Sequence, residues 1–179
     1  MPWNPFKKKD AKPDLDPLRD LTLSDMKPGY LLDYDLKTWS VTAQNRYDFE
    51  GDSVDEWQLS SGSEVRYLER EEDDTVTWTL SRKVPLADVD AGLQAHMKEN
   101  DDPPESIAFE GIEYEGESTA FGRFYKDGEG SGQDFVAWDY IDASGSLSLT
   151  LEQWGDEEYE ASVGESVEEY QFSNILPSG

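Results

Sequence analysis

The sequence predicts an all-β, mainly antiparallel fold built from two related modules. From Tyr30 onward, apolar and aromatic side chains alternate with polar ones, which is the pattern of half-buried antiparallel strands. Turn residues such as Gly51-Asp52 and Ser61-Gly62 separate the alternating segments. A series of aromatic and charged residues then recurs in the same order in the second half, which favours an internal duplication.

Five strands are expected in the first half, at residues 32–36, 39–47, 54–59, 65–69 and 76–84. The last of these alternates strictly, with Val76, Trp78 and Leu80 on one face. Because the segments are short and joined by turns, they predict a meander of neighbouring antiparallel strands.

The alternation stops at Pro85 and a helical period replaces it. Leu86, Val89, Leu93 and Met97 recur at intervals of three or four residues, which predicts one amphipathic helix over 85–100. Two aspartates and two prolines at 101–104 then form a linker. Strands are expected again at residues 107–109, 112–124, 135–141, 147–154, 159–161 and 167–172.

The internal repeat consists of four matches in register. They pair residues 42–47 with 119–124, Trp57 with Trp138, 68–69 with 151–152, and 73–76 with 156–159. Two such modules would bury their apolar sheet faces against each other, as a pseudo-twofold sandwich or barrel-like domain with one linking helix. The predicted segments are a basic, proline-rich tail (1–20), a first module (21–84), the linking helix and linker (85–104) and a second module (105–179).

The charge and the cysteine content argue against several classes of protein. The 179 residues hold 41 acids and 15 bases, for a formal charge of −26, and contain no cysteine. Disulfides and thiolate chemistry are therefore absent, and nucleic acid is a poor partner for so acidic a chain. No apolar run approaches the ~20 residues that cross a bilayer, so we expect a cytoplasmic protein, or one at the inner face of the membrane. The acidity fits either a basic partner or a salt-rich habitat.

No set of catalytic residues is recognisable. The single histidine, His96, lies on the predicted helix, and Ser131 lies in a glycine loop and not in a nucleophile elbow. Paired acids such as Glu71-Glu72 and Asp73-Asp74 fall at turns, where solvation is expected. We therefore expect no catalytic residue and no cofactor.

The candidate binding residues are two arginines and four aromatic residues. Arg46 and Arg123 each precede an aromatic residue in their repeat, and would either pair with a carboxylate across a hairpin or bind an anionic ligand or partner. Two repeated tryptophans would be core anchors or ligand-stacking platforms. The repeated pair is Trp57 and Trp138. The other two aromatic residues, Trp3 and Phe6, precede the lysines at 7–9 and would belong either to an arm that attaches to a membrane or partner, or to a solvated N-terminal segment.

The segment 127–134 offers a weak alternative metal site. Oxygen-bearing side chains recur there among glycines, as in calcium loops, at Asp127, Glu129, Ser131 and Asp134. The segment lacks the bidentate glutamate of the helix–loop–helix signature and lies between strands. A flexible hairpin loop is the stronger interpretation.

Several short segments resemble a bacterial family of uncharacterised proteins. They include Leu32-Asp33-Tyr34, Glu56-Trp57-Gln58-Leu59 and Leu151-Glu152-Gln153-Trp154-Gly155. The chain from Tyr30 to Asn174 thereby resembles domain-of-unknown-function family 4178. The resemblance implies no catalytic residue, and it implies an accessory or adaptor role.

The expected function is that of a non-catalytic adaptor, monomeric or homodimeric. Its acidic surface would dock a basic or membrane-associated protein. The alternative is a protein that binds a small ligand or calcium, in the cleft between the modules or in the 127–134 loop. A hydrolase that uses paired carboxylates ranks third, and would need a carboxyl with a pKa near 6.

Overall fold

The computed structural model describes residues 21–177, which form eleven strands, two short α-helices and three 3-10 turns. The first half contains η1 (Leu23–Asp25), β1 (Leu31–Tyr34), β2 (Lys37–Phe49), β3 (Asp52–Ser61), β4 (Glu64–Glu72) and β5 (Val76–Val84). Two helices follow, α1 (Leu86–Val89) and α2 (Leu93–Asn100). The second half contains β6 (Ser106–Phe109), β7 (Ile112–Tyr125), η2 (Lys126–Gly128), β8 (Gln133–Asp142), β9 (Leu147–Gln153), β10 (Tyr159–Val167), η3 (Glu169–Gln171) and β11 (Ser173–Leu176).

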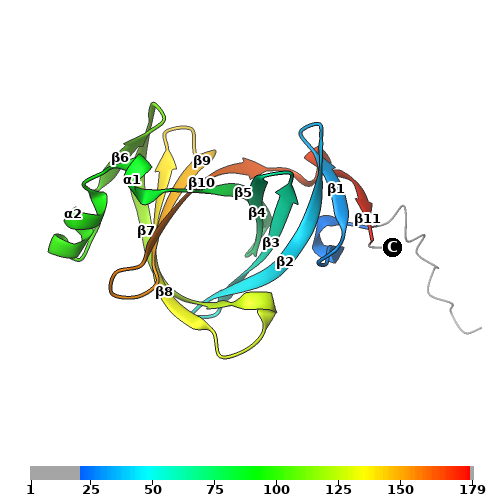
Figure 1. Ribbon diagram of the computed structural model, residues 1–179, viewed down its shortest axis with the longest axis horizontal. Helices are drawn as coiled ribbons and strands as arrows, with labels where there is room; N and C mark the ends of the chain where they lie inside the picture. The colour runs from blue at the N-terminus through cyan, green and yellow to red at the C-terminus, as the bar shows by residue number, and fades with distance from the viewer. Residues whose placement is uncertain (1–20, 178–179) are drawn as a thin grey trace, which may run out of the picture.

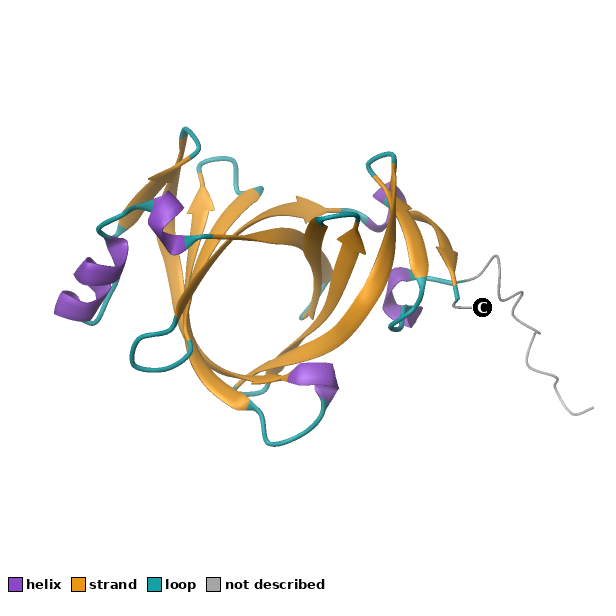
Figure 2. Ribbon diagram, in the orientation of Figure 1, coloured by secondary structure: helices purple, strands orange, loops and turns teal. Residues whose placement is uncertain are grey.

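All eleven strands belong to one antiparallel sheet that closes on itself. Its order is β11-β1-β2-β3-β4-β5-β10-β9-β8-β7-β6, and β2 also pairs with β7. The strands from β2 to β7 in this order therefore form a closed ring, which Figures 1 and 2 show nearly end-on. The predicted all-β, antiparallel fold is confirmed.

The two halves of the ring share one hydrogen-bonding register. Cross-strand partners follow the order Trp57–Leu68–Leu80 in the first half and Trp138–Leu151–Ala161 in the second. Across the β5–β10 seam, Leu80 faces Glu165 and Ala161 faces Val84, which is the relation that a twofold axis between the halves requires. The architecture is thus pseudo-twofold, while the duplication of the sequence stays a prediction.

β2 and β7 each change neighbours along their length. β2 begins beside β1 and ends beside β7, and β7 begins beside β6 and ends beside β2. A β-bulge marks the change, because Thr42 has no partner in β3 and Glu117 has none in β8. Beyond each bulge the alternation is shifted by one residue, so Ala43 and Ser118 face the inside of the ring.

The apolar face of the ring points outward and is covered in two separate places. η1, β1 and β11 cover one cluster, and α1, α2 and β6 cover the other on the opposite side (Figure 1). The first cluster contains Leu23, Met26, Leu32, Trp39, Val41, Trp57, Leu59, Leu68, Trp78, Leu80, Val167 and Phe172. The second contains Val84, Val89, Leu93, Met97, Ile107, Phe109, Tyr114, Trp138, Tyr140, Leu149, Leu151 and Ala161. The expectation that the modules bury their apolar faces against each other is therefore wrong, because those faces lie outside a ring.

The predicted helix over 85–100 is two short helices. The chain leaves helical geometry at Asp90, whose φ is −158°, and its carboxylate accepts a hydrogen bond from the amide of Gly92 at 2.6 Å. This local turn competes with the helical hydrogen bonds, and glycine adds a further entropic cost to a continuous helix. Val89, Leu93 and Met97 are nevertheless buried, as the period predicts.

The predicted strand over 167–172 is also wrong. β10 extends to Val167, and the chain then turns through η3, where Glu168 donates its amide to the side chain of Gln171 at 2.7 Å. β11 follows and pairs with β1. The C-terminal segment therefore completes the layer over the first apolar cluster.

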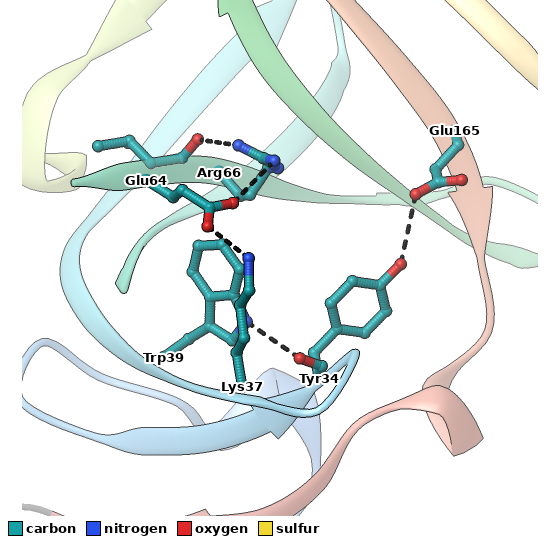
Figure 3. A network of polar contacts seen from close by, with 7 residues as sticks. Tyr34, Lys37, Trp39, Glu64, Arg66 and Glu165 are labelled. Carbon is teal, nitrogen blue, oxygen red and sulfur yellow. Dashed lines mark hydrogen bonds and ion pairs between the residues drawn. The ribbon is translucent and has the colours of Figure 1, made fainter. Parts of the chain in front are cut away.

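A polar network fastens the β1–β2 hairpin to the outside of the ring (Figure 3). The hydroxyl of Tyr34 donates to Glu165 of β10 at 3.3 Å, and the Trp39 indole donates to the Tyr34 carbonyl at 3.2 Å. The Arg66 guanidinium lies 5.7 Å from the Trp39 ring centre and pairs with Glu64, which Lys37 also contacts. These polar groups are thus engaged in holding the outer layer.

Candidate functional site

The inside of the ring holds two cavities that meet at a wall of carboxylates. The larger, of about 600 Å³, is lined by Tyr47, Tyr67, Phe124, Trp154 and Tyr159 together with polar groups, and we call it the aromatic chamber. The other, of about 520 Å³, is lined by Ser118, Ser146, Ser148, Thr150, Thr79 and Ser166 together with acids, and we call it the hydroxyl chamber. Both volumes fall in the range of small-molecule sites.

The wall between the chambers, which we call the acidic partition, consists of Glu56, Glu69, Glu152 and Glu160. Glu56 and Glu69 are direct partners across the β3–β4 ladder, and Glu152 and Glu160 are direct partners across β9–β10. Like charges placed opposite each other on neighbouring strands oppose folding. Their presence here is typical of sites where stability is given up for function.

The surroundings of these carboxyls raise their pKa values. Burial raises the pKa of Glu56, although its carboxylate accepts hydrogen bonds from Asn45 at 2.8 Å and Tyr47 at 3.1 Å. Burial, with the charges of Glu56 and Glu152, raises the pKa of Glu69 well above its ordinary value. Burial raises the pKa of Glu152 to about 7, with Lys83 opposing the shift and Glu160 adding to it. Burial is thus the main cause of the raised pKa values in the partition.

One cation, Lys83 of β5, already lies in this acidic interior. Its ammonium pairs with Glu160 and lies 5.4 Å from the ring centre of Tyr67. Burial lowers the pKa of Lys83, but the hydrogen bond and charge of Glu160 outweigh burial, so the pKa is raised overall. The chamber thus holds a primary ammonium between a carboxylate and an aromatic face.

Five aromatic rings meet at the β2–β7 seam. Trp154 stacks on Phe135 with ring centres 4.7 Å apart, and its edge faces Phe124 at 5.5 Å. Tyr47 contacts Phe124 at 4.9 Å and Phe135 at 5.5 Å. Phe49 completes the group, 5.5 Å from Phe135. Because the rings support one another, this side of the aromatic chamber is preformed.

The Trp154 indole leaves a buried donor inside this wall. Its Nε1–H makes no hydrogen bond to any group within residues 21–177, although it lies near enough to the Glu152 carboxyl to favour the charged form. A buried donor without a partner costs free energy, which makes it a candidate contact for a bound molecule.

The hydroxyl chamber has a different chemistry. Asp139 accepts hydrogen bonds there from Ser118 at 3.1 Å and Thr150 at 2.9 Å. Within the described part of the chain, no lysine, arginine or histidine lines this chamber. Its five acids are Asp52, Glu69, Glu71, Glu117 and Asp139. Phe49 and Tyr140 also line this chamber, so what distinguishes the aromatic chamber is its lysines together with its larger group of rings.

The two predicted arginines lie on the outside of the ring, at the β2–β7 seam. Arg123 faces Asp48 in the ladder and pairs with Asp134 at 2.7 Å, so one of the two expected arginine–carboxylate pairs is present. Arg46 is exposed and forms no ion pair with residues 21–177. Neither side chain lines a chamber.

The repeated tryptophans are core residues of the two apolar clusters. Trp57 is 1% exposed and donates its indole N–H to the Met26 carbonyl at 3.0 Å, and Trp138 is 7% exposed and donates to Asp102 at 2.8 Å. Both rings are enclosed and cannot stack on a ligand. Trp3 and Phe6 lie outside the described residues.

The proposed calcium loop is engaged in other contacts. The amide of Asp127 donates to Asn45 at 3.1 Å, and Asp134 pairs with Arg123. Between residues 21 and 177, no three histidine, cysteine, aspartate or glutamate side chains are grouped so that they would hold a metal ion. The segment contributes instead to the lining of the aromatic chamber through Gln133, as does Lys126 directly before it.

The functional residues that sequence reasoning missed are the inward-facing glutamates. Glu69 continues the alternation of Val65 and Tyr67, and its counterpart in the repeat is Glu152. An acid that falls on the same face in both repeats was the available signal. It was not recognised because the many acids of this chain suggested solvation.

Comparisons with known proteins give a family and no activity. The model of a family described as "Domain of unknown function (DUF4178)" matches residues 27–169. An "Uncharacterized protein" from Aquifex aeolicus (strain VF5) is 24% identical over 155 residues, which cover 87% of this chain and 85% of that protein. No solved structure matches, and none of the helices within residues 21–177 has the length and apolar character to traverse a membrane. The chain therefore belongs to the family of the domain of unknown function DUF4178.

Proposed function

We propose that the protein binds a small molecule inside the ring, in the aromatic chamber. The observation that carries this proposal is a preformed cavity of about 600 Å³ in which aromatic rings, a paired lysine and an acidic partition converge. An interior intended only for stability would be filled with apolar side chains, as interiors usually are. The proposal corresponds to the alternative expected from the sequence, a ligand in the cleft between the modules.

Two matched substitutions test which chamber holds the ligand. Ala43 faces the aromatic chamber and Ala120 faces the hydroxyl chamber, both from strands of the same seam. Ala43→Trp would fill the first cavity and Ala120→Trp the second. A thermal-shift screen of a metabolite library should find a ligand that stabilises the wild type and Ala120→Trp, by about 5–10 °C near 100 Kd, but not Ala43→Trp. Equal stabilisation of both variants would place the site elsewhere.

A second function, general acid–base catalysis by Glu152, is favoured by one observation. Burial raises the pKa of this carboxyl to about 7, into the range in which a general acid works near neutral pH, and a second carboxyl, Glu160, lies opposite it in the ladder. Nuclear magnetic resonance of a retrieved ligand incubated with the protein distinguishes the two functions. Conversion that is lost in Glu152→Gln, with binding retained, would support catalysis, and an unchanged ligand would support binding alone.

Docking of a basic or membrane-associated protein, a cytoplasmic location and a monomeric or dimeric state stay predictions.

A further inference from the structure

We propose that the ligand of the aromatic chamber is a small organic cation whose charged end is an ammonium group. This inference rests on the proposed binding function and adds the chemical class of the ligand. Three independent features of the chamber support it: its charge balance, the contacts of Lys83 and the composition of its wall.

The charge balance of the chamber favours a cation. Its lining contains Glu56 and Glu160 in the interior against Lys83, with Glu157, Glu158 and Lys126 at the exposed rim, where Glu157 pairs with Lys98. Glu69 and Glu152 lie directly behind, in the acidic partition. Because Lys83 is already paired with Glu160, the remaining interior carboxyls have no cation of their own in the partition. A positively charged ligand would offset their repulsion.

Lys83 shows how such a ligand would be held. Its ammonium contacts the Glu160 carboxylate and lies 5.4 Å from the centre of the Tyr67 ring. A carboxylate combined with an aromatic face is the arrangement that recognises ammonium groups. A second carboxylate with an aromatic ring beside it lines the same chamber, in Glu56 and Tyr47, whose hydroxyl donates to Glu56 at 3.1 Å.

The wall suits an organic cation better than a metal ion. A metal prefers several charged or imidazole ligands at short range, and no three histidine, cysteine, aspartate or glutamate side chains between residues 21 and 177 are grouped in that way. Phe124, Trp154 and Tyr47 instead offer an apolar surface beside the carboxylates. An organic cation would use both, with its alkyl part on the rings and its charge on the acids.

The test compares molecules that share a carbon skeleton and differ in charge. Calorimetric titrations at constant ionic strength would use n-butylamine, 1-butanol and butyrate, with tetramethylammonium as a quaternary probe. We expect the two cations to bind and the alcohol and the acid to bind at least about tenfold more weakly, because they lose the carboxylate contact. Equal or tighter binding of 1-butanol or butyrate would overturn the inference.

Three variants identify the groups responsible. Glu160→Gln should weaken amine binding about tenfold, and Lys83→Met should strengthen it by a similar factor, because a competing cation is removed. Glu110→Gln removes an acid on the outside, where it pairs with Arg82, and should leave binding unchanged. A purely structural role of Lys83 would predict the opposite sign, so weaker amine binding in Lys83→Met would overturn the inference.

The outcomes separate this inference from the proposed function. If a library compound is blocked by Ala43→Trp but no amine binds, the ammonium assignment is wrong and the binding function stands. If no compound of any charge is sensitive to Ala43→Trp, both are wrong.

Discussion

The aromatic chamber and the hydroxyl chamber occupy the two ends of one pseudo-twofold ring, yet they have different chemistry. The backbone ladders of the two halves are in equivalent register, and each half contributes one glutamate, Glu69 or Glu152, at the same position of the partition. Five aromatic residues and Lys83 line one chamber, while mainly serine, threonine and acids, with Phe49 and Tyr140, line the other. Symmetry of the scaffold therefore does not carry over to the site, and specificity depends on the side chains placed at equivalent ladder positions.

The largest effect on the free energy of unfolding is expected from a change in the acidic partition, which separates the chambers. Burial raises the pKa of Glu152 from its ordinary value near 4.5 to about 7. Between these pH values the folded chain keeps a proton that the unfolded chain has released, so the free energy of unfolding falls as the pH rises. Glu56, Glu160, Lys83 and the Trp154 indole all act on this carboxyl. Glu152→Gln should flatten the pH dependence by about 3 kcal/mol over this range.

Urea unfolding of the wild type and Glu152→Gln at pH 5, 6, 7 and 8 measures this difference. Glu165→Gln, which removes a carboxylate from the outer face, is the matched control and should keep the slope of the wild type. Parallel curves for all three proteins would mean that Glu152 is ionised throughout and that the partition is hydrated.

The next effect on stability is expected in the cluster of aromatic rings at the β2–β7 seam. A Cβ atom at Gly122 would lie 2.7 Å from Phe135 and 2.9 Å from Phe49, so Gly122→Ala forces these rings apart. We expect a loss of about 1–3 kcal/mol in stability and a changed near-ultraviolet circular dichroism spectrum. Gly155→Ala meets open space and serves as the control. Similar spectra and stabilities for both variants would show that the ring cluster adapts freely.

A smaller effect is expected in the hydroxyl chamber. Thr150→Val removes a hydrogen bond of 2.9 Å to Asp139 and should cost about 1 kcal/mol of stability in urea. Amine binding should stay at the wild-type value, because Thr150 does not line the aromatic chamber. Loss of binding in this variant would show that the two chambers act as one site.

The smallest effect concerns the outer surface. Arg123 and Asp134 form an ion pair in which the side chains are 49% and 76% exposed. Exposed pairs contribute little, because water screens the charges and the side chains lose conformational freedom. Asp134→Asn should leave both the unfolding midpoint and ligand binding within experimental error. A clear loss of binding would return attention to the arginines at the seam.

Local sequence patterns predicted the strands well, because alternation reports directly on which residues share a face. They also identified Trp57 and Trp138 as candidates for core anchors, and both are buried. The predicted helix over 85–100 is interrupted at one place, where the Asp90 carboxylate accepts a hydrogen bond from the Gly92 amide, although the apolar period around it is correct. β11 was missed because its pairing with β1 joins residues at opposite ends of the chain.

The site could not be predicted, because alternation does not say which face of a sheet turns inward. The usual assumption places apolar residues inside, and this ring has them outside under two small covering layers. Glu56 and Glu69 therefore look like solvated acids in sequence but face each other in the interior. The closure of the sheet decides which face turns inward, and it depends on the β2–β7 and β5–β10 pairings.

The bulge at Thr42 makes β2 respond differently to losing a residue and to gaining one. Residues before it point outward at odd numbers, as Trp39 does, whereas those after it point inward at odd numbers, as Tyr47 does. Deleting the single residue Thr42 would remove the bulge and leave a continuous alternation in which Ala43 still points inward, so Asn45 and Tyr47 would keep facing the chamber. One residue inserted directly after Ala43 would instead rotate Asn45 and Tyr47 to the outside. Ligand binding should therefore survive the deletion and be lost on the insertion.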